Sequence, residues 1–474
     1  MAHPSALCTL CRQLVLFSFR LWANGNVGKK VVKGPPSKVK TKGAKSNPED
    51  DESIASSDEE FAEERERKIH QEDESSDEEE AETAQEKRLR LAKTYLEEIE
   101  REEKDRAEFE EGVVTKRLQD EYLEEKGRLR KTVANNYTGH AEPFLLRCKD
   151  QKSSITCLCL SSDGKFAYSG SKDGTVVKWS LNERSKLKVI KGKRKGTEGI
   201  KYVRCLALST DGKFLAVGDS GSKDIKIYSG NDLTHIKNFQ GHRGVVSGLV
   251  FRRDTYMLYS ASEDRSVKVW NLDDMAYVES MFGHQNGITS IDALSRERAI
   301  TSGGFDGTIR VWKIVEESQL IFNGHSGSID AVKLINEENF FSCGDDGQLC
   351  VWGSMKKKPL CSVPEAHGRD ESNGRPTWIS SIATLLNTDL VASASVSGSR
   401  DGLIRLWKCG EAFRSLTQLM EIKVCGFVNA LAFTPDGSSL VAGIGQEHRL
   451  GRWWRIPEAK NCIVVIPLMK KNST

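Results

Sequence analysis

Residues 241–270 read GHRGVVSGLVFRRDTYMLYSASEDRSVKVW, a stretch that begins with Gly-His and ends with Trp. The dipeptide returns at Gly283-His284 and Gly324-His325, and then as Ala366-His367, in steps of 42, 41 and 42 residues. A Trp closes each of these units, at Trp270, Trp312, Trp352 and Trp407. Self-similarity at a fixed period of this size indicates a repeat architecture, in which each unit is one supersecondary element.

A second regularity lies inside the units, where an Asp precedes the closing Trp by six residues. It does so at Asp173, Asp264, Asp306, Asp346 and Asp401. All of these except Asp264 are followed by Gly, and Asp-Gly suits a tight hairpin turn. Each unit therefore reads as four short strands. Because one four-stranded sheet cannot cover its own faces, neighbouring sheets must stack in a ring.

The pattern resembles the WD repeat, whose period is about 40–45 residues with Gly-His near the start and Trp near the end. The resemblance implies an all-β, WD-repeat β-propeller. It also implies that His242, Ser260 or Ser262, Asp264 and Trp270 bind one another within a blade. The corresponding residues of the next two units are His284, Asp306 and Trp312, then His325, Asp346 and Trp352. We expect all of these to be structural.

The units predict a seven-bladed propeller over residues 142–468. The blades end at Trp179, Tyr228, Trp270, Trp312, Trp352, Trp407 and the pair Trp453-Trp454. The second unit departs from the pattern, because it lacks Gly-His and its Asp224 lies only four residues before Tyr228. The sixth is stretched by an insert around residues 368–377. We expect Phe144 to Arg147 to close the last blade, which removes exposed sheet edges.

The N-terminal region has a different composition. Residues 29–45 hold seven lysines and no acid, whereas residues 49–80 hold seventeen acids and three bases. Such a segment cannot bury a core, so residues 1–82 are predicted to be a disordered, basic-then-acidic tail. Over residues 83–135 apolar residues recur at helical spacing, which predicts a charged amphipathic helical segment. Its members are Leu89, Ala92, Tyr95, Leu96 and Ile99, then Val113, Leu118, Tyr122 and Leu129.

The sequence lacks the motifs that are typical of several functional classes. The twelve cysteines have no repeated spacing, which favours a reducing compartment over a disulfide framework. Cys8 and Cys11 form a lone CxxC without further ligands, so no metal site is expected. There is no phosphate-binding loop, zinc-protease motif or nucleophile elbow, so we expect neither an enzyme nor a cofactor. No run of eighteen apolar residues suggests a membrane span.

Basic residues point to a polyanionic partner. The formal charge of the chain is only +2, but residues 1–131 sum to about −7, which leaves about +9 on the propeller. The densest basic groups are Lys193, Arg194 and Lys195 between the first two blades, and Arg449, Arg452 and Arg455 in the last blade. Charged loops on a rigid ring can bind phosphates, which favours RNA. Arg452 and Arg455 could instead pair with acids inside the last blade.

A run in the last blade is more specific than the repeats. Residues 445–455 read GQEHRLGRWWR, and this run resembles the WD-repeat proteins of the U3 small nucleolar ribonucleoprotein (U3 small nucleolar RNA-interacting protein 2 family). Residues 378–382 (WISSI), 317–320 (ESQL) and 82–87 (ETAQEK) carry the same resemblance. The likeness spans about residues 82–468, and residues 1–28 do not share it.

The resemblance implies a non-catalytic RNA-binding and scaffold subunit that acts in pre-ribosomal RNA processing and small-subunit biogenesis. The implied partners are U3 small nucleolar RNA, the kink-turn-binding and box C/D core proteins, and proteins of the small-subunit processome. The implied location is the nucleus and nucleolus. Two other functions fit a propeller. One is recognition of a protein tail, as an adaptor in a chromatin or ubiquitin-ligase complex. The other is a purely architectural subunit that docks through residues 83–131.

Overall fold

The computed structural model describes residues 84–104, 113–192, 199–369, 374–396, 401–452 and 455–471. The tail predicted over residues 1–82 lies outside them. The chain divides into two compact units, Met1–Tyr122 and Leu123–Thr474. None of the helices in the described part of the chain is both long enough and apolar enough to cross a membrane.

Two helices follow the predicted apolar spacing, α3 (Ala84–Lys104) and α4 (Val113–Glu125). Tyr95 and Ile99 of α3 are buried with Leu118 of α4 in a small apolar cluster. The Tyr95 hydroxyl donates to the carboxylate of Glu121 at 2.7 Å. Because α4 ends at Glu125, Leu129 lies beyond the helix on which its spacing placed it.

The second unit contains seven antiparallel sheets, each with the strand order expected of a propeller blade. The first three blades are β3 (Ile155–Leu160), β4 (Phe166–Ser171), β5 (Val176–Ser180) and β6 (Ser185–Ile190); β7 (Val203–Leu208), β8 (Phe214–Asp219), β9 (Ile225–Ser229) and β10 (His235–Phe239); and β11 (Val246–Phe251), β12 (Met257–Ser262), β13 (Ser266–Asn271) and β14 (Ala276–Phe282).

The next three blades are β15 (Ser290–Ala293), β16 (Arg298–Ser302), β17 (Thr308–Lys313) and β18 (Ser318–Asn323); β19 (Ile329–Leu334), β20 (Asn339–Gly344), β21 (Leu349–Gly353) and β22 (Cys361–Val363); and β23 (Trp378–Thr384), β24 (Leu390–Val396), β25 (Asp401–Cys409) and β26 (Leu416–Cys425). Short 3₁₀ turns span Ala134–Asn136 and Glu411–Phe413. The first strands of consecutive blades pack against one another, which places them on the inside of the ring.

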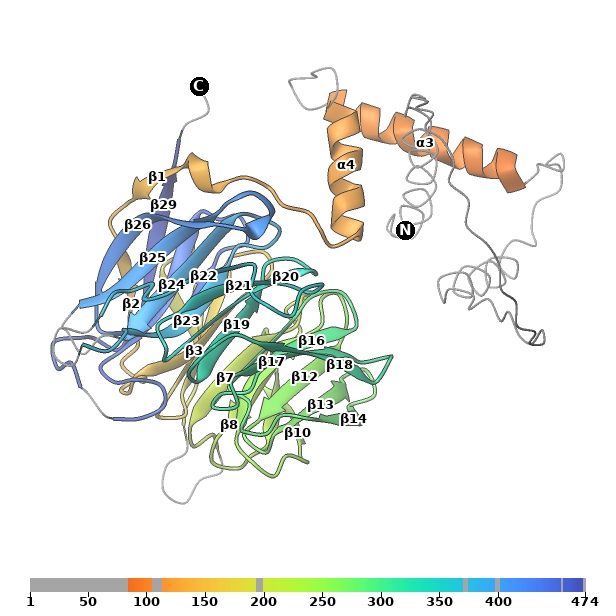
Figure 1. Cartoon of the computed structure of the whole chain (residues 1–474). Helices are drawn as coiled ribbons and strands as arrows, with labels where there is room; N and C mark the ends of the chain where they lie inside the picture. Colours follow the sequence, from red (N-terminus) through yellow and green to blue (C-terminus); the bar gives the residue numbers. More distant parts are fainter. Residues whose placement is uncertain are drawn as a thin grey trace, which may run out of the picture. The chain divides into compact units, whose positions relative to one another are not determined.

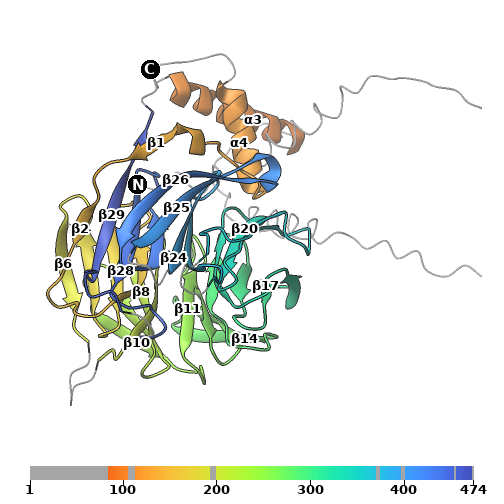
Figure 2. The same cartoon turned by 60° about the vertical axis from the view of Figure 1, so that its left-hand side comes forward.

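The seventh blade closes the ring. It contains β27 (Phe427–Phe433), β28 (Ser439–Gly445) and β29 (Cys462–Lys470) from the end of the chain, with β1 (Tyr137–His140) and β2 (Phe144–Leu146) from before the first blade. Both early strands pair with β29, with Phe144 opposite Val465 and Tyr137 opposite Lys470. Figures 1 and 2 show β29 beside β1 and β2. The expected closing strand is therefore present, and β1 lengthens it.

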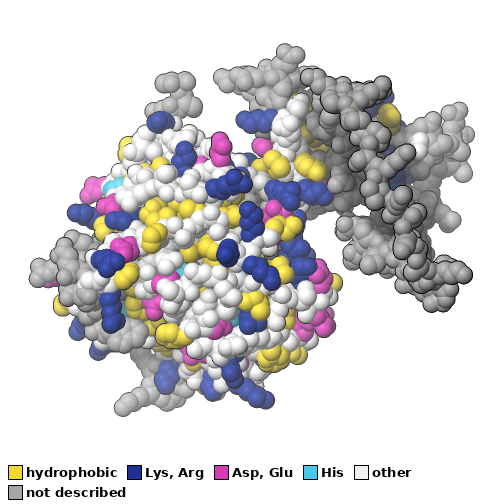
Figure 3. All heavy atoms as spheres, in the orientation of Figure 1, with side chains coloured by type: hydrophobic (Ala, Val, Ile, Leu, Met, Phe, Trp, Pro, Cys, Tyr) yellow, Lys and Arg dark blue, Asp and Glu magenta, His cyan; other side chains and the backbone are white. Residues whose placement is uncertain are grey.

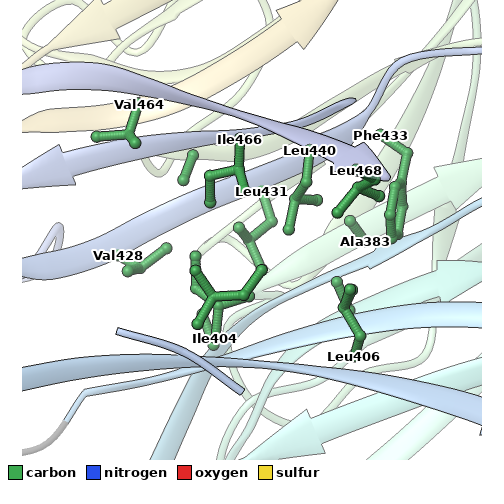
Figure 4. Packing of buried hydrophobic residues seen from close by; sticks show 14 of the residues in the cluster. Ala383, Ile404, Leu406, Val428, Leu431, Phe433, Leu440, Val464, Ile466 and Leu468 are labelled. Carbon is green, nitrogen blue, oxygen red and sulfur yellow. The ribbon is translucent and has the colours of Figure 1, made fainter. Parts of the chain in front are cut away.

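Apolar side chains fill the space between neighbouring blades. Figure 4 shows Ile404 and Leu406 of the sixth blade facing Val428, Leu431 and Ile466 of the seventh. Ile404 and Leu406 are two residues apart on β25, a register shift in β27 brings Val428 and Leu431 to one face, and all are buried. Burial of this kind on both faces of each sheet is what makes a ring of blades stable where a single blade is not.

The third blade contains the network that the repeat pattern implied. His242 lies with Nδ1 2.9 Å from Asp264 Oδ2 and Nε2 2.8 Å from Ser260 Oγ. Trp270 Nε1 donates to the same Ser260 Oγ at 2.8 Å. Ser260, and not Ser262, is therefore the hydroxyl that joins His to Trp.

The next two blades repeat this geometry. His284 lies between Asp306 at 2.8 Å and Thr301, whose hydroxyl also accepts from Trp312. In the fifth blade the equivalent residues are His325, Asp346, Ser342 and Trp352, at 2.6–2.9 Å. In each case the network links the turn after the second strand to the loop that enters the blade, so it holds both in register.

In the second blade, the loop that enters the blade is held by a residue that the spacing did not indicate. Asp219, at the end of β8, accepts from the backbone N–H groups of Lys201 and Tyr202 and pairs with Lys226 at 3.0 Å. Asp224, the carboxylate nearest Tyr228 in sequence, is not part of that network. An Asp at the strand end thus replaces the His-Asp pair of the third, fourth and fifth blades.

The sixth blade has an incomplete network. His367 Nε2 lies 2.7 Å from Ser393 Oγ, which also accepts from Trp407 Nε1. Its Nδ1 is buried without a hydrogen-bond partner among the described residues. Burial lowers the pKa of His367 to about 3, and the charge of Arg405 acts in the same direction.

Acidification should therefore destabilise the ring through His367. An unfolded histidine has a pKa of about 6.5, so below that pH the unfolded chain binds a proton at His367 that the folded chain does not bind. The free energy of unfolding should fall as pH drops below about 6.5, by ~2 kcal/mol at pH 5 from this residue. Unfolding of wild type and His367→Gln at pH 7 and pH 5 measures it, with His140→Gln as the exposed control. Equal losses in wild type and His367→Gln would contradict the assignment.

Candidate nucleic-acid interface

The six basic residues selected from the sequence fall into three groups. Lys193, Arg194 and Lys195 lie outside the described residues. Arg449 is half-buried, with its guanidinium group enclosed by the protein, whereas Arg452 and Arg455 are exposed. The last three belong to the connection between β28 and β29, residues 446–461, which we call the crossing loop.

The crossing loop is bound to the first blade at its start. Glu447 N–H donates to Ser154 Oγ at 3.0 Å, and the Glu447 carboxylate lies 3.6 Å from Lys172 Nζ. Lys172 also donates to the carbonyl of Gly451 at 3.2 Å. Asn461, at the other end of the loop, donates to the carbonyl of Lys152 at 2.7 Å. Both ends of the loop are therefore held to the neighbouring blade.

Arg449 bonds the crossing loop to residues of other blades. Its Nη2 donates to the backbone carbonyl of Asp330 in β19 at 3.0 Å, and its own N–H donates to Asn429 Oδ1 at 2.8 Å. Its carbonyl accepts from the hydroxyl of Tyr202, which precedes β7. Residues of the second, fifth and seventh blades thus meet at Arg449, through its backbone and its side chain.

The carboxylate of Asp330 is the charge that faces Arg449. Trp378 Nε1 donates to Asp330 Oδ2, and the ring of Trp378 lies 4.4 Å from that of His448, centroid to centroid. Burial raises the pKa of Asp330 to about 6, although Arg449 acts in the opposite direction. Burial likewise lowers the pKa of His448 to about 2, so this imidazole is neutral. The inner part of the loop is a buried polar cluster and not an exposed basic surface.

The outer part of the loop is exposed. Arg452 is 74% exposed and lies 2.5 Å from Glu447 Oε1, so the pairing with an acid of the last blade does occur for this residue. Arg455 donates to the side-chain oxygen of Gln446 at 3.2 Å. Both guanidinium groups remain at the surface, held by short-range partners that also belong to the loop.

Further basic residues lie in turns and blade-entering loops at this end of the ring. Lys152, Lys201, Lys223 and Arg243 are all exposed. Lys223 Nζ donates to the carbonyl of Arg243 at 2.8 Å, which joins the second and third blades. They are scattered along the sequence, so a search for dense basic runs passes over them. Their positions in the repeat, next to the Asp turn or the Gly-His loop, are the signal that could have found them.

No group of three or more metal-binding side chains occurs in the residues that the structure describes. The comparisons with known proteins agree with the propeller. A WD domain, G-beta repeat model matches residues 142–180, 186–229, 233–271, 276–313 and 316–353. Human U3 small nucleolar RNA-interacting protein 2 is 53% identical over 82% of this chain and 83% of its own length.

The chain belongs to the U3 small nucleolar RNA-interacting protein 2 family. The mouse member is 52% identical over 82% of this chain and 83% of its own length. The solved structure of RRP9 WD40 repeats shares 51% identity and superposes with a TM-score of 0.66. It covers 70% of this chain and 99% of that one. This chain therefore shares its WD40 propeller fold with that solved structure.

Proposed function

We propose that this protein is a non-catalytic RNA-binding and scaffold subunit of the U3 small nucleolar ribonucleoprotein, acting in pre-ribosomal RNA processing in the nucleolus. The observation that carries the proposal is the membership of the chain in the U3 small nucleolar RNA-interacting protein 2 family over most of its length. The proposed partners are U3 RNA, the kink-turn-binding and box C/D core proteins, and small-subunit processome proteins.

The internal chemistry supports a non-catalytic role. Ser260, His242 and Asp264 are the residue types of a hydrolase triad, and their hydrogen bonds resemble one. The Ser260 side chain is fully buried, however, and its Oγ already accepts from Trp270. A nucleophile needs an exposed oxygen facing a substrate, so this set stabilises a blade.

The position of Arg449 bears on the tail-recognition alternative. That function predicts an acidic or aromatic central opening that is free for a peptide. At the end of the ring near the crossing loop, Arg449 and His448 lie against Asp330 and Trp378 instead. The residues that could hold a peptide there are bonded to the chain itself, so RNA binding is the better supported function.

We assign the RNA contacts of this end to the exposed Arg452 and Arg455. Lys193, Arg194 and Lys195, which lie outside the described residues, are also proposed to contact phosphates. Arg449 is proposed to hold the crossing loop from inside and not to touch RNA. Guanidinium groups suit phosphate because their planar fork donates two parallel hydrogen bonds.

The double variant Arg452→Gln/Arg455→Gln should weaken U3 RNA binding by about tenfold at 0.1 M salt. Loss of two phosphate contacts should also lower the slope of log K against log salt by ~1.5. Glutamine is preferred to glutamate because a new acid would repel Glu447. Binding titrations at several salt concentrations measure both quantities, with Lys237→Gln/Lys423→Gln as the matched control on outer strands. An unchanged affinity and slope would exclude these two arginines.

A further inference from the structure

A segment before the first blade runs across the opposite end of the ring from the Asp turns. Residues 128–136, which we call the strap, pass over the turns that follow β19 and β23. Lys131 exchanges backbone hydrogen bonds with Asn387 and Asp389, at 2.7 and 3.1 Å. Asp389, fully buried, accepts from the N–H groups of Val133 and Ala134 at 2.8 and 2.9 Å. The strap is therefore a fixed part of this surface.

The strap brings basic residues from distant parts of the chain together. Arg130 donates to the carbonyl of Cys409 at 2.7 Å and lies over the ring of Phe413, 5.3 Å from its centroid. Phe413 belongs to the same apolar cluster as Leu360, which ends the turn that carries Lys356, Lys357 and Lys358. Arg130, Lys131, Lys356, Lys357, Lys358 and Arg414 thus form one surface, which we call the strap surface.

The balance of charge on the strap surface is strongly positive. The three segments that build it, 128–135, 354–360 and 410–415, contain seven Lys or Arg and one acid, Glu411. Arg128 is neutralised by Glu338 at 2.8 Å. Among the described residues, the six members of the strap surface form no ion pair with a carboxylate, and all except the half-buried Arg130 are exposed. Figure 3 shows Lys and Arg side chains spread over the face of the propeller in view, with Asp and Glu side chains among them.

From this surface we infer that the protein has a second RNA-binding site, separate from the crossing loop and at the other end of the ring. Its ligand is the phosphate backbone of RNA. Lysines are compact charges that neutralise phosphates without reading bases, so this site adds affinity and orientation and not sequence specificity. Two sites at opposite ends would let one protein hold two separated segments of the same RNA. The inference rests on the proposed function.

The double variant Lys357→Glu/Lys358→Glu in the full chain tests the site. Its affinity for a U3 RNA transcript should fall by about tenfold at 0.1 M salt, and the salt slope should fall by ~1.5. Lys237→Glu/Lys423→Glu, with the same change of charge on outer strands, is the matched control. Circular dichroism confirms that each variant is folded.

A hydroxyl-radical footprint separates a second site from a general change in electrostatic attraction. Wild type should protect two segments of the transcript, the Lys357→Glu/Lys358→Glu variant should lose one, and Arg452→Gln/Arg455→Gln should lose the other. A Lys357→Glu/Lys358→Glu variant with the wild-type footprint and slope would overturn the second site and leave the proposed function standing. If the Lys357→Glu/Lys358→Glu variant kept the wild-type footprint and slope but lost a protein from the particle, the strap surface would be assigned to an acidic protein. The second RNA-binding site would then also be overturned. A wild-type chain without salt-dependent binding would instead overturn the proposed function and both sites.

Discussion

Replacement of Trp352 by Ala should lower the free energy of unfolding of the ring by about 4 kcal/mol. Trp352 is fully buried between the fourth and fifth blades, stacked on Phe340 with ring centroids 6.0 Å apart and edge-on to Phe322. The substitution removes this packing and leaves Ser342 and His325 without the indole N–H that completes their network. Denaturant unfolding at pH 7 measures the loss.

Trp352→Phe is the matched control for this prediction. Phenylalanine keeps most of the apolar volume but cannot donate to Ser342, so Trp352→Phe should lower the free energy of unfolding by about 1–2 kcal/mol. The expected order of stability is wild type, Trp352→Phe, Trp352→Ala. If both variants lost the same amount, the hydrogen bond and not the packing would account for the effect.

Arg449→Met should lower the free energy of unfolding by about 3–5 kcal/mol, because it leaves the buried carboxylate of Asp330 without the positive charge of Arg449 nearby. Asp330 is buried, and its carboxylate accepts from Trp378 Nε1. Arg449 donates to the backbone carbonyl of the same residue, and its charge acts to lower the pKa of the Asp330 carboxyl. The loss should be larger at pH 7.5 than at pH 5. The reason is that the raised pKa of Asp330, about 6, lets the carboxyl accept a proton at the lower pH.

The double variant Arg449→Met/Asp330→Asn distinguishes this account from simple loss of packing. Asparagine carries no charge and can still bond Trp378, so the double variant should be more stable than Arg449→Met alone. A double variant that is less stable than the single one would show that the Asp330 charge is not what Arg449 compensates. Both measurements use unfolding free energies, with RNA affinity as a second readout of the crossing loop.

Much of the fold could be predicted because its determinants are local and repeated. Gly-His, Asp and Trp lie at fixed separations, and they meet within one blade, so the roles of His284, Asp306 and Trp312 followed from spacing. The closing strand followed from a physical requirement, since an open ring would expose sheet edges. Asp219 was missed because it lies nine residues before Tyr228, at the end of β8, whereas the other aspartates lie six before Trp.

The candidate site was harder to predict because it depends on contacts between distant blades. The density of basic residues along the sequence does not distinguish Arg449 from Arg452 and Arg455. Only the path of the crossing loop places the guanidinium group of Arg449 against the backbone of Asp330 and leaves Arg452 and Arg455 exposed. The strap surface has the same character, because Arg130 and Lys357 are more than two hundred residues apart in sequence. Neither feature has a local signature.

Crosslinking of the protein to RNA in nuclear extract, followed by sequencing of the attached RNA, tests the central proposal most directly. The account predicts reads concentrated on U3 small nucleolar RNA, at two separated segments. Reads dispersed over many RNAs, with protein partners dominating the recovered material, would contradict it and would make the propeller a module for peptide recognition.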